Sequence, residues 1–133
     1  MEVYVRLIAS SETFSPDEIF NRLGVRGDNY WCTGELRRGT LLREKDNGLA
    51  FNSTAAKDSD LDSHIRSFAD LLAGSELKFG EFSRIPGCAV HISCSIYFRD
   101  VPPLSFDSDL VGWMEAIGAS LDIDLYPLSN AGA

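Results

Sequence analysis

Residues 88–98 read CAVHISCSIYF, and this stretch decides the fold. Larger apolar side chains stand at every second position, with smaller or more polar ones between them. Because successive side chains of a strand point to opposite sides of a sheet, the stretch predicts one long strand with a buried apolar face. That face comprises Cys88, Val90, Ile92, Cys94, Ile96 and Phe98. The opposite, more polar face comprises Ala89, His91, Ser93, Ser95 and Tyr97.

Two further segments near the chain ends have the same one-sided character. Residues 1–9 alternate between apolar and polar side chains, although Ile8 weakens the pattern at its end. Residues 121–126 alternate Leu, Ile and Leu with Asp, Asp and Tyr. Each is expected to form a strand with one buried and one polar face.

Helix signals follow the first predicted strand, precede the last one, and also occur in the middle of the chain. The segment FSPDEI (residues 14–19) contains a capping box and a hydrophobic staple, and Gly24 is expected to end this short helix. Apolar spacing over residues 60–72 predicts the longest helix, and residues 75–84 are expected to form another. A stapled helix beginning after Asp107 is expected before the last strand.

The segment between the first two predicted helices is expected to hold a loop and a hairpin. Residues 24–35 contain three glycines and two adjacent aromatics, which is typical of a loop. Residues 38–44 and 48–53 flank the sequence KDN, and Asn47-Gly48 is a strong turn pair. The sequence therefore predicts that residues 38–44 and 48–53 pair as two strands.

The predicted element order is β-α-β-β-α-α-β-α-β. This order indicates an α+β two-layer sandwich, a mostly antiparallel sheet with helices packed on one face. We expect a ferredoxin-like variant with inserted helices. Residues 1–128 are expected to form a single domain and residues 129–133 a flexible C-terminal tail.

Charge is distributed unevenly along the 133 residues, which carry a net charge of -8. Residues 1–57 hold eight basic and eight acidic residues, whereas residues 58–133 hold four basic and twelve acidic ones. An acidic half disfavours nucleic acid and favours solubility or encounter with a basic partner. No signal peptide or membrane-length apolar run is visible, so we expect a cytoplasmic location and no membrane contact.

The polar faces of the three one-sided strands form the first candidate site. If helices cover the other face, the side chains here meet water or a partner, and tyrosines among charges are typical of contact surfaces. The alternative is a solvated face with cross-strand pairs such as Arg6 with Asp122 or Asp124. The candidate binding residues are Tyr4, Arg6, His91, Tyr97, Asp122, Asp124 and Tyr126.

Residues 27–38 (GDNYWCTGELRR) form the second candidate site. Tyr30 and Trp31 could stack on a planar anion while Arg37 and Arg38 grip its charge. The alternative is that Trp31 plugs one end of the core.

No catalytic, metal or cofactor site is predicted. His91 and Cys94 face opposite sides of one strand, so they cannot share a metal ion or form a catalytic pair. Asp122 and Asp124 face the same side, but the D-x-D pattern is weak and structural roles explain it. Cys88 and Cys94 lie about 20 Å apart along one strand, too far for a disulfide.

Several segments, in their order along the chain, resemble a known family. They are residues 14–19 with 23–24, residues 31–35, residues 64–72, residues 90–94, and the most specific, IGASLDIDLY (residues 117–126). With them the chain resembles the bacterial domain-of-unknown-function family 4279, although Phe51 stands where that family often has a second tryptophan. The resemblance implies a compact cytoplasmic bacterial α+β domain and no particular activity.

These observations favour a non-enzymatic binding or interaction domain. One concrete form is an immunity-type inhibitor that neutralises a basic protein partner. The alternative is a small enzyme or small-ligand binder that uses the Tyr30–Trp31 loop and the polar sheet face. A pocket joining His91, Tyr97, Asp122 and Asp124 would favour the enzyme, and a homodimer through the open face is a third alternative.

Overall fold

A computed structural model describes residues 1–129 of the chain. The predicted long strand is present as β4 (Cys88–Phe98), and it pairs with a strand on each side. The other strands are β1 (Glu2–Ser11), β2 (Asn29–Trp31), β3 (Asn47–Asn52) and β5 (Ala119–Pro127). The helices are α1 (Pro16–Leu23), α2 (Leu61–Leu71), α3 (Glu76–Ser83) and α4 (Ser108–Ala116).

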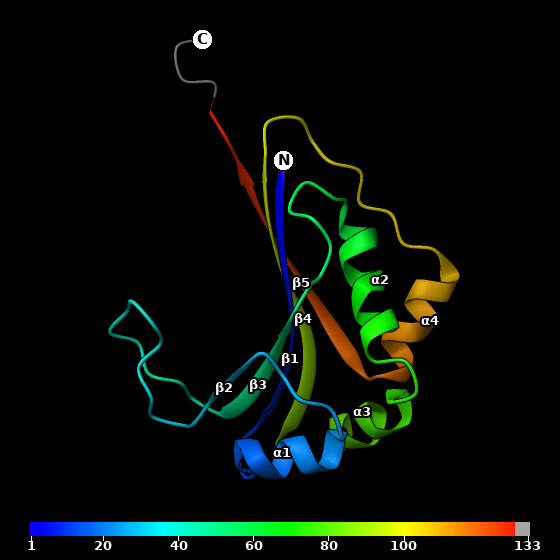
Figure 1. Cartoon of the computed structure of the whole chain (residues 1–133). Coiled ribbons are helices and arrows are strands. Elements are labelled where there is room, and N and C mark those ends of the chain that lie inside the picture. The colour runs from blue at the N-terminus through cyan, green and yellow to red at the C-terminus, as the bar shows by residue number, and fades with distance from the viewer. Residues whose placement is uncertain (130–133) are drawn as a thin grey trace.

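The five strands form one sheet in the order β2-β3-β1-β4-β5. All neighbouring strands are antiparallel except β4 and β5, which are parallel and are joined through α4. Figure 1 shows the four helices on one side of this sheet. The expected α+β sandwich, with a mostly antiparallel sheet and helices on one face, is thereby confirmed.

The topology differs from the simple ferredoxin-like pattern in how the two parallel strands β4 and β5 are arranged. In the split βαβ unit of that pattern, an antiparallel strand lies between the two parallel strands. Here β4 and β5 are direct neighbours. The expected tail at residues 129–133 lies outside the described residues except for its first member.

The predicted capping signals start α1. The Ser15 hydroxyl accepts a hydrogen bond from the Glu18 backbone nitrogen at 3.2 Å, and a Glu18 carboxylate oxygen accepts one from the Ser15 nitrogen at 3.3 Å. This capping box satisfies two of the free N–H groups at the start of α1. Gly24 then ends α1 with a φ of 73°, a left-handed conformation that suits glycine.

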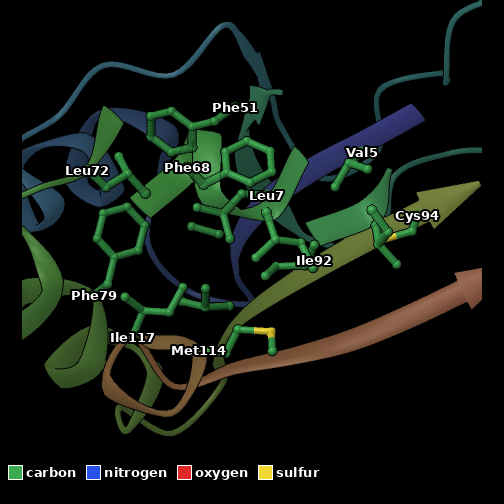
Figure 2. Close-up of a cluster of buried hydrophobic side chains, with 14 of the residues drawn as sticks. Val5, Leu7, Phe51, Phe68, Leu72, Phe79, Ile92, Cys94, Met114 and Ile117 are labelled. Carbon is green, nitrogen blue, oxygen red and sulfur yellow. The ribbon is translucent and has the colours of Figure 1, made fainter. Parts of the chain in front are cut away.

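The covered face of the sheet forms the core with the helices. The inward side chains of β1 and β4 are almost fully excluded from water, including Leu7, Ile92 and Cys94. They meet a layer of apolar side chains that includes Phe68 and Phe79 (Figure 2). One continuous core of this kind unites the helices and the sheet.

The predicted hairpin of residues 38–44 with residues 48–53 is wrong. β3 begins at Asn47 and pairs with β1 on one side and β2 on the other, and residues 38–44 contribute only an isolated bridge between Arg43 and Leu36. Figure 1 shows the β2–β3 connection projecting from the sheet. Residues 38–44 bury little apolar surface, since Leu41 remains 93% exposed.

Candidate binding site on the open sheet face

Strand pairing collects the predicted polar side chains of β1, β4 and β5 on the sheet face that the helices leave open. Residues that are paired across a sheet point to the same side of it. The rows are Glu2–Tyr97–Tyr126, Tyr4–Ser95–Asp124, Arg6–Ser93–Asp122 and Ile8–His91–Ser120. The first candidate site is therefore contiguous in space, although its residues come from opposite ends of the chain.

Three tyrosines meet at one end of this face and form what we call the tyrosine cluster: Tyr4, Tyr97 and Tyr126. The ring of Tyr97 stacks on that of Tyr126, with centroids 4.8 Å apart, and meets Tyr4 edge-on at 6.0 Å. Each tyrosine is 36–44% exposed. Mutual ring contacts thus order an aromatic surface that solvent still reaches.

Acidic groups lie beside the tyrosine cluster on β1 and β5. The Tyr4 hydroxyl donates a 2.6 Å hydrogen bond to the Glu2 carboxylate, and this bond to a charged acceptor raises the pKa of Tyr4. Asp122 and Asp124 are both exposed on the neighbouring edge strand. One cation approaches, because Lys57 Nζ lies 5.3 Å from the centre of the Tyr4 ring. The cluster therefore presents aromatic area inside a mainly acidic border.

The suggested cross-strand pairing of Arg6 with Asp122 or Asp124 is wrong. β1 and β5 are not neighbours, because β4 lies between them and places Ser93 in the row between Arg6 and Asp122. Among the described residues, Arg6 makes neither a hydrogen bond nor an ion pair. Its one directed contact is with Trp31, where the guanidinium carbon lies 5.8 Å from the centre of the indole.

A cleft with a volume of about 370 Å³ opens beside Arg6, between the sheet and the β2–β3 connection. We call it the Trp31 cleft. Ile8 and His91 belong to its sheet side, and Arg37 and Lys45 come from the connection. Its lining is Arg6, Ile8, Ser10, Trp31, Arg37, Glu44, Lys45, Asp46 and His91. The two candidate sites predicted from the sequence thus meet in one cavity.

Backbone packing places Trp31 in this cleft. Trp31 is paired with Gly48 across β2 and β3, and a Cβ atom at Gly48 would lie 2.4 Å from the indole ring. The ring therefore occupies space that only a glycine leaves free. Trp31 does not plug one end of the core, because it lies outside the set of side chains that form the core.

The predicted loop site is divided by the structure. Trp31 and Arg37 line the cleft, and Arg37 is held there by Glu44 at 3.3 Å. Arg38 is not part of the lining, and Tyr30 lines a second hollow beside the start of α1, which Trp31 also borders. The Tyr30 hydroxyl accepts a hydrogen bond from the Gly27 nitrogen at 3.0 Å, which ties it to its own loop.

Sequence reasoning missed five lining residues: Ile8, Ser10, Glu44, Lys45 and Asp46. Of these, Ile8 carried a signal in the sequence and Lys45 did not. Ile8 interrupts the polar face of the first strand, and an apolar side chain at a polar-face position is a mark of a partly covered spot. Lys45 was assigned to a hairpin turn, where a lysine has no particular role. In the structure Ile8 is half-buried and Lys45 lines the cleft above the sheet.

In the described residues, no single pocket joins His91, Tyr97, Asp122 and Asp124, the arrangement that would favour an enzyme. His91 lies in the Trp31 cleft, whereas Tyr97 lines a separate shallow hollow with Glu2, Tyr4 and Ser95. Asp122 and Asp124 line neither. Across residues 1–129, no three histidine, cysteine, aspartate or glutamate side chains are grouped so as to hold a metal ion.

The remaining titratable groups of interest lie under the helices. His64 Nδ1 is 2.7 Å from the Ser53 hydroxyl, which in turn lies 3.1 Å from that of Ser67, and this contact joins α2 to the end of β3. Burial lowers the pKa of His64, and Asp60 opposes the shift only in part. Burial also raises the pKa of Cys94 to about 12. Cys94 thus lies in the closed core, whereas His64 also lines a hollow of about 300 Å³ with Tyr4, Arg6 and Lys57.

Fold and surface define the protein as a single-sheet α+β domain with one helix-covered face and one open face that carries aromatic and charged side chains. The chain belongs to the family of unknown function DUF4279, whose model matches residues 1–128. Searches of the curated proteins and of the solved structures gave no match. Within the described residues, no helix has both the length and the apolar character needed to cross a bilayer.

Proposed function

We propose that this protein is a non-enzymatic interaction domain that binds a basic protein through the tyrosine cluster. The observation that carries the proposal is the ordered, half-exposed set of Tyr4, Tyr97 and Tyr126. Tyrosines of this kind supply apolar contact area and a hydrogen-bonding tip at little cost in conformational entropy. Preordering by ring contacts reduces that cost further.

The acidic border specifies the charge of the partner. Glu2 and Asp124 share rows of the sheet with the tyrosine cluster, and Asp122 lies one row beyond. The second half of the chain holds twelve acidic against four basic residues. Complementary charge speeds encounter and excludes acidic competitors. A second copy of this chain would bring the same acidic groups against each other, so a basic partner fits this surface better than a homodimer.

We also propose a cytoplasmic, bacterial setting for this interaction. Three unpaired thiols suit a reducing compartment. The concrete form that fits a small acidic domain is an immunity-type inhibitor, which neutralises a basic toxin by covering its active surface. In that form the tyrosine cluster supplies the affinity and the acidic border supplies the fast encounter.

Charge reversal on the open face tests the proposal. The immobilised protein is exposed at low salt to an extract of cells that carry its gene. A double variant Asp122→Lys/Asp124→Lys is compared with Glu81→Lys/Glu115→Lys, which makes the same change in charge on exposed positions of α3 and α4. We expect a basic protein to be retained by the wild type and the helix variant and to bind the open-face variant at least about tenfold more weakly.

Two results would contradict the proposal. One is recovery of no protein at low salt, and the other is equal loss of binding in both double variants. Light scattering on the purified chain addresses the homodimer: a concentration-dependent dimer that Asp122→Lys/Asp124→Lys changes would assign the open face to self-association instead. The partner's active surface, once identified, then decides whether the interaction is inhibitory.

A further inference from the structure

We propose that the Trp31 cleft is a second binding site, separate from the tyrosine cluster, for a small planar aromatic monoanion such as an aromatic carboxylate. The cleft's volume of about 370 Å³ is near the lower end of the range for small-molecule sites. The site combines an apolar surface, an aromatic wall and cationic groups. Its chemistry concerns a ligand and does not depend on the proposed protein partner.

The apolar part of the site fits a flat ring. Ile8 provides an apolar side chain on a face that is otherwise polar, and the Trp31 indole stands beside it in the same cleft. Since the indole lies where a side chain at Gly48 would have to be, its position is restricted by packing. A ring that enters the cleft therefore meets a wall that is already in place, which limits the entropy lost on binding.

The cationic part of the site is available to an anion. Arg6 has no hydrogen bond or ion pair with any of residues 1–129, and its guanidinium carbon lies 5.8 Å from the centre of the Trp31 indole. Lys45 also lines the cleft and makes no ion pair within that range. A guanidinium without a carboxylate partner is a ready bidentate site for a carboxylate. It can bind the charged end of a ligand whose ring rests against Trp31.

The acidic lining limits the charge that the ligand carries. Glu44 neutralises Arg37 at 3.3 Å, and Asp46 also faces the cleft. A multiply charged phosphate would meet both carboxylates without gaining from the apolar surface. A monoanion with a flat apolar body uses Arg6, Ile8 and Trp31 together, and this combination selects the aromatic acid.

Three matched probes separate charge from planarity. Benzoate is planar and anionic, cyclohexanecarboxylate is anionic but not planar, and benzamide is planar but neutral. Each is titrated into ¹⁵N-labelled protein while the indole N–H signal of Trp31 and the amide of His91 are followed. We expect benzoate to bind with a Kd of roughly 1 mM, as suits so small a fragment, and each of the other probes to bind about tenfold more weakly.

Paired variants locate the site. Arg6→Gln and Arg37→Gln remove one charge each from the cleft, and Arg38→Gln removes the same charge from the neighbouring position outside it. We expect Arg6→Gln to weaken benzoate binding about tenfold, Arg37→Gln to weaken it less because of Glu44, and Arg38→Gln to leave it unchanged. Trp31→Ala, followed through His91, should also weaken binding about tenfold.

The proposal is overturned if benzoate leaves both signals unmoved, if the three probes bind equally, or if Arg38→Gln weakens binding as much as Arg6→Gln does. Arg6 is an exposed surface residue, so Arg6→Gln is expected to fold. It therefore still tests the proposal if Trp31→Ala fails to fold. The variant Asp122→Lys/Asp124→Lys should still bind benzoate. Loss of the protein partner and loss of the ligand site are therefore distinguishable.

Discussion

The two faces of the sheet differ in what their side chains contact, although both belong to the same strands. On the covered face, neighbouring side chains of β1 and β4 pack against helices and exclude water almost completely. On the open face, tyrosines contact one another and Arg6 contacts a single indole. The covered face therefore provides most of the stability, and the open face is freer to carry function.

Alternation along a strand separates two kinds of constraint, one on each face of the sheet. Shifting β4 by one residue would exchange its two faces, and so the covered face fixes the register of every open-face residue. The rows that join Tyr97 with Tyr126 and His91 with Ile8 follow from that register. The arrangement of the open face therefore follows from core packing on the other side of the sheet.

Thiol labelling is expected to show the largest difference between the covered face and an exposed site. Cys94 lies on the covered face with its pKa raised by burial to about 12, whereas Cys32 is exposed in the β2–β3 connection. We expect an aromatic disulfide reagent to modify Cys94 at least about a thousandfold more slowly than Cys32, because Cys94 reacts only after the core opens. Stopped-flow absorbance on Cys32→Ser and Cys94→Ser variants assigns the phases. Fast labelling of Cys94 would show that the covered face is not a stable core.

Adjacent substitutions on β4 give the next largest contrast. Ile92 is fully buried, and its neighbour Ser93 faces the open side. Ile92→Ala should lower the free energy of unfolding by about 2–5 kcal/mol, since it removes buried methyl groups and leaves a cavity. Ser93→Ala should change it by no more than about 0.5 kcal/mol. Urea unfolding measures both, and similar losses would contradict the division of roles between the faces.

Much of this arrangement was predictable from local patterns. Period-two alternation gave β1, β4 and β5 with their correct faces, and the capping signals at Ser15 and Asp107 gave the starts of two helices. These signals succeed because each depends on neighbours within a few residues. The open-face residues of the three strands were therefore identified before their pairing was known.

The error at Asn47 and Gly48 shows where local patterns fail. This pair is typical of a hairpin turn, but here it begins β3. The Asn47 side chain accepts a hydrogen bond from the Thr33 nitrogen at 2.8 Å and donates one to the Phe14 carbonyl at 2.9 Å, while Gly48 leaves room for Trp31. Each of these contacts joins segments at least fourteen residues apart. A pattern within one segment cannot report them, and so the Trp31 cleft was missed as a unit.

Substitution of Gly48 tests whether the open face tolerates a larger side chain. A Cβ atom there would collide with the indole, so Gly48→Val should lower the free energy of unfolding by about 1–3 kcal/mol and displace Trp31. The cost should fall in a Trp31→Ala background, because the colliding ring is then absent. Chemical denaturation of the single and double variants measures the coupling. An equal loss of stability in the wild type and in Trp31→Ala would show that the strain does not come from contact with the indole.

The tyrosine cluster gives a smaller exception to the tolerance of the open face. Tyr97 makes both ring contacts, so Tyr97→Ala should lower the free energy of unfolding by about 1 kcal/mol. Tyr97→Phe keeps the rings and should cost no more than about 0.5 kcal/mol. A cost for Tyr97→Phe as large as that for Tyr97→Ala would assign the stability to the hydroxyl rather than to stacking.

Acid titration isolates a small contribution from the helix layer. Burial holds the pKa of His64 in the folded protein below its ordinary value of 6.5. The unfolded chain therefore binds a proton more readily as the pH falls through about 6.5, and stability should decrease there. Asp60 and Asp107 have pKa values lowered by hydrogen bonds, so their contributions disappear only below about pH 3.8. Urea midpoints between about pH 7 and pH 5 should fall in the wild type and stay nearly level in His64→Asn; an equal fall in both would remove His64 as the cause.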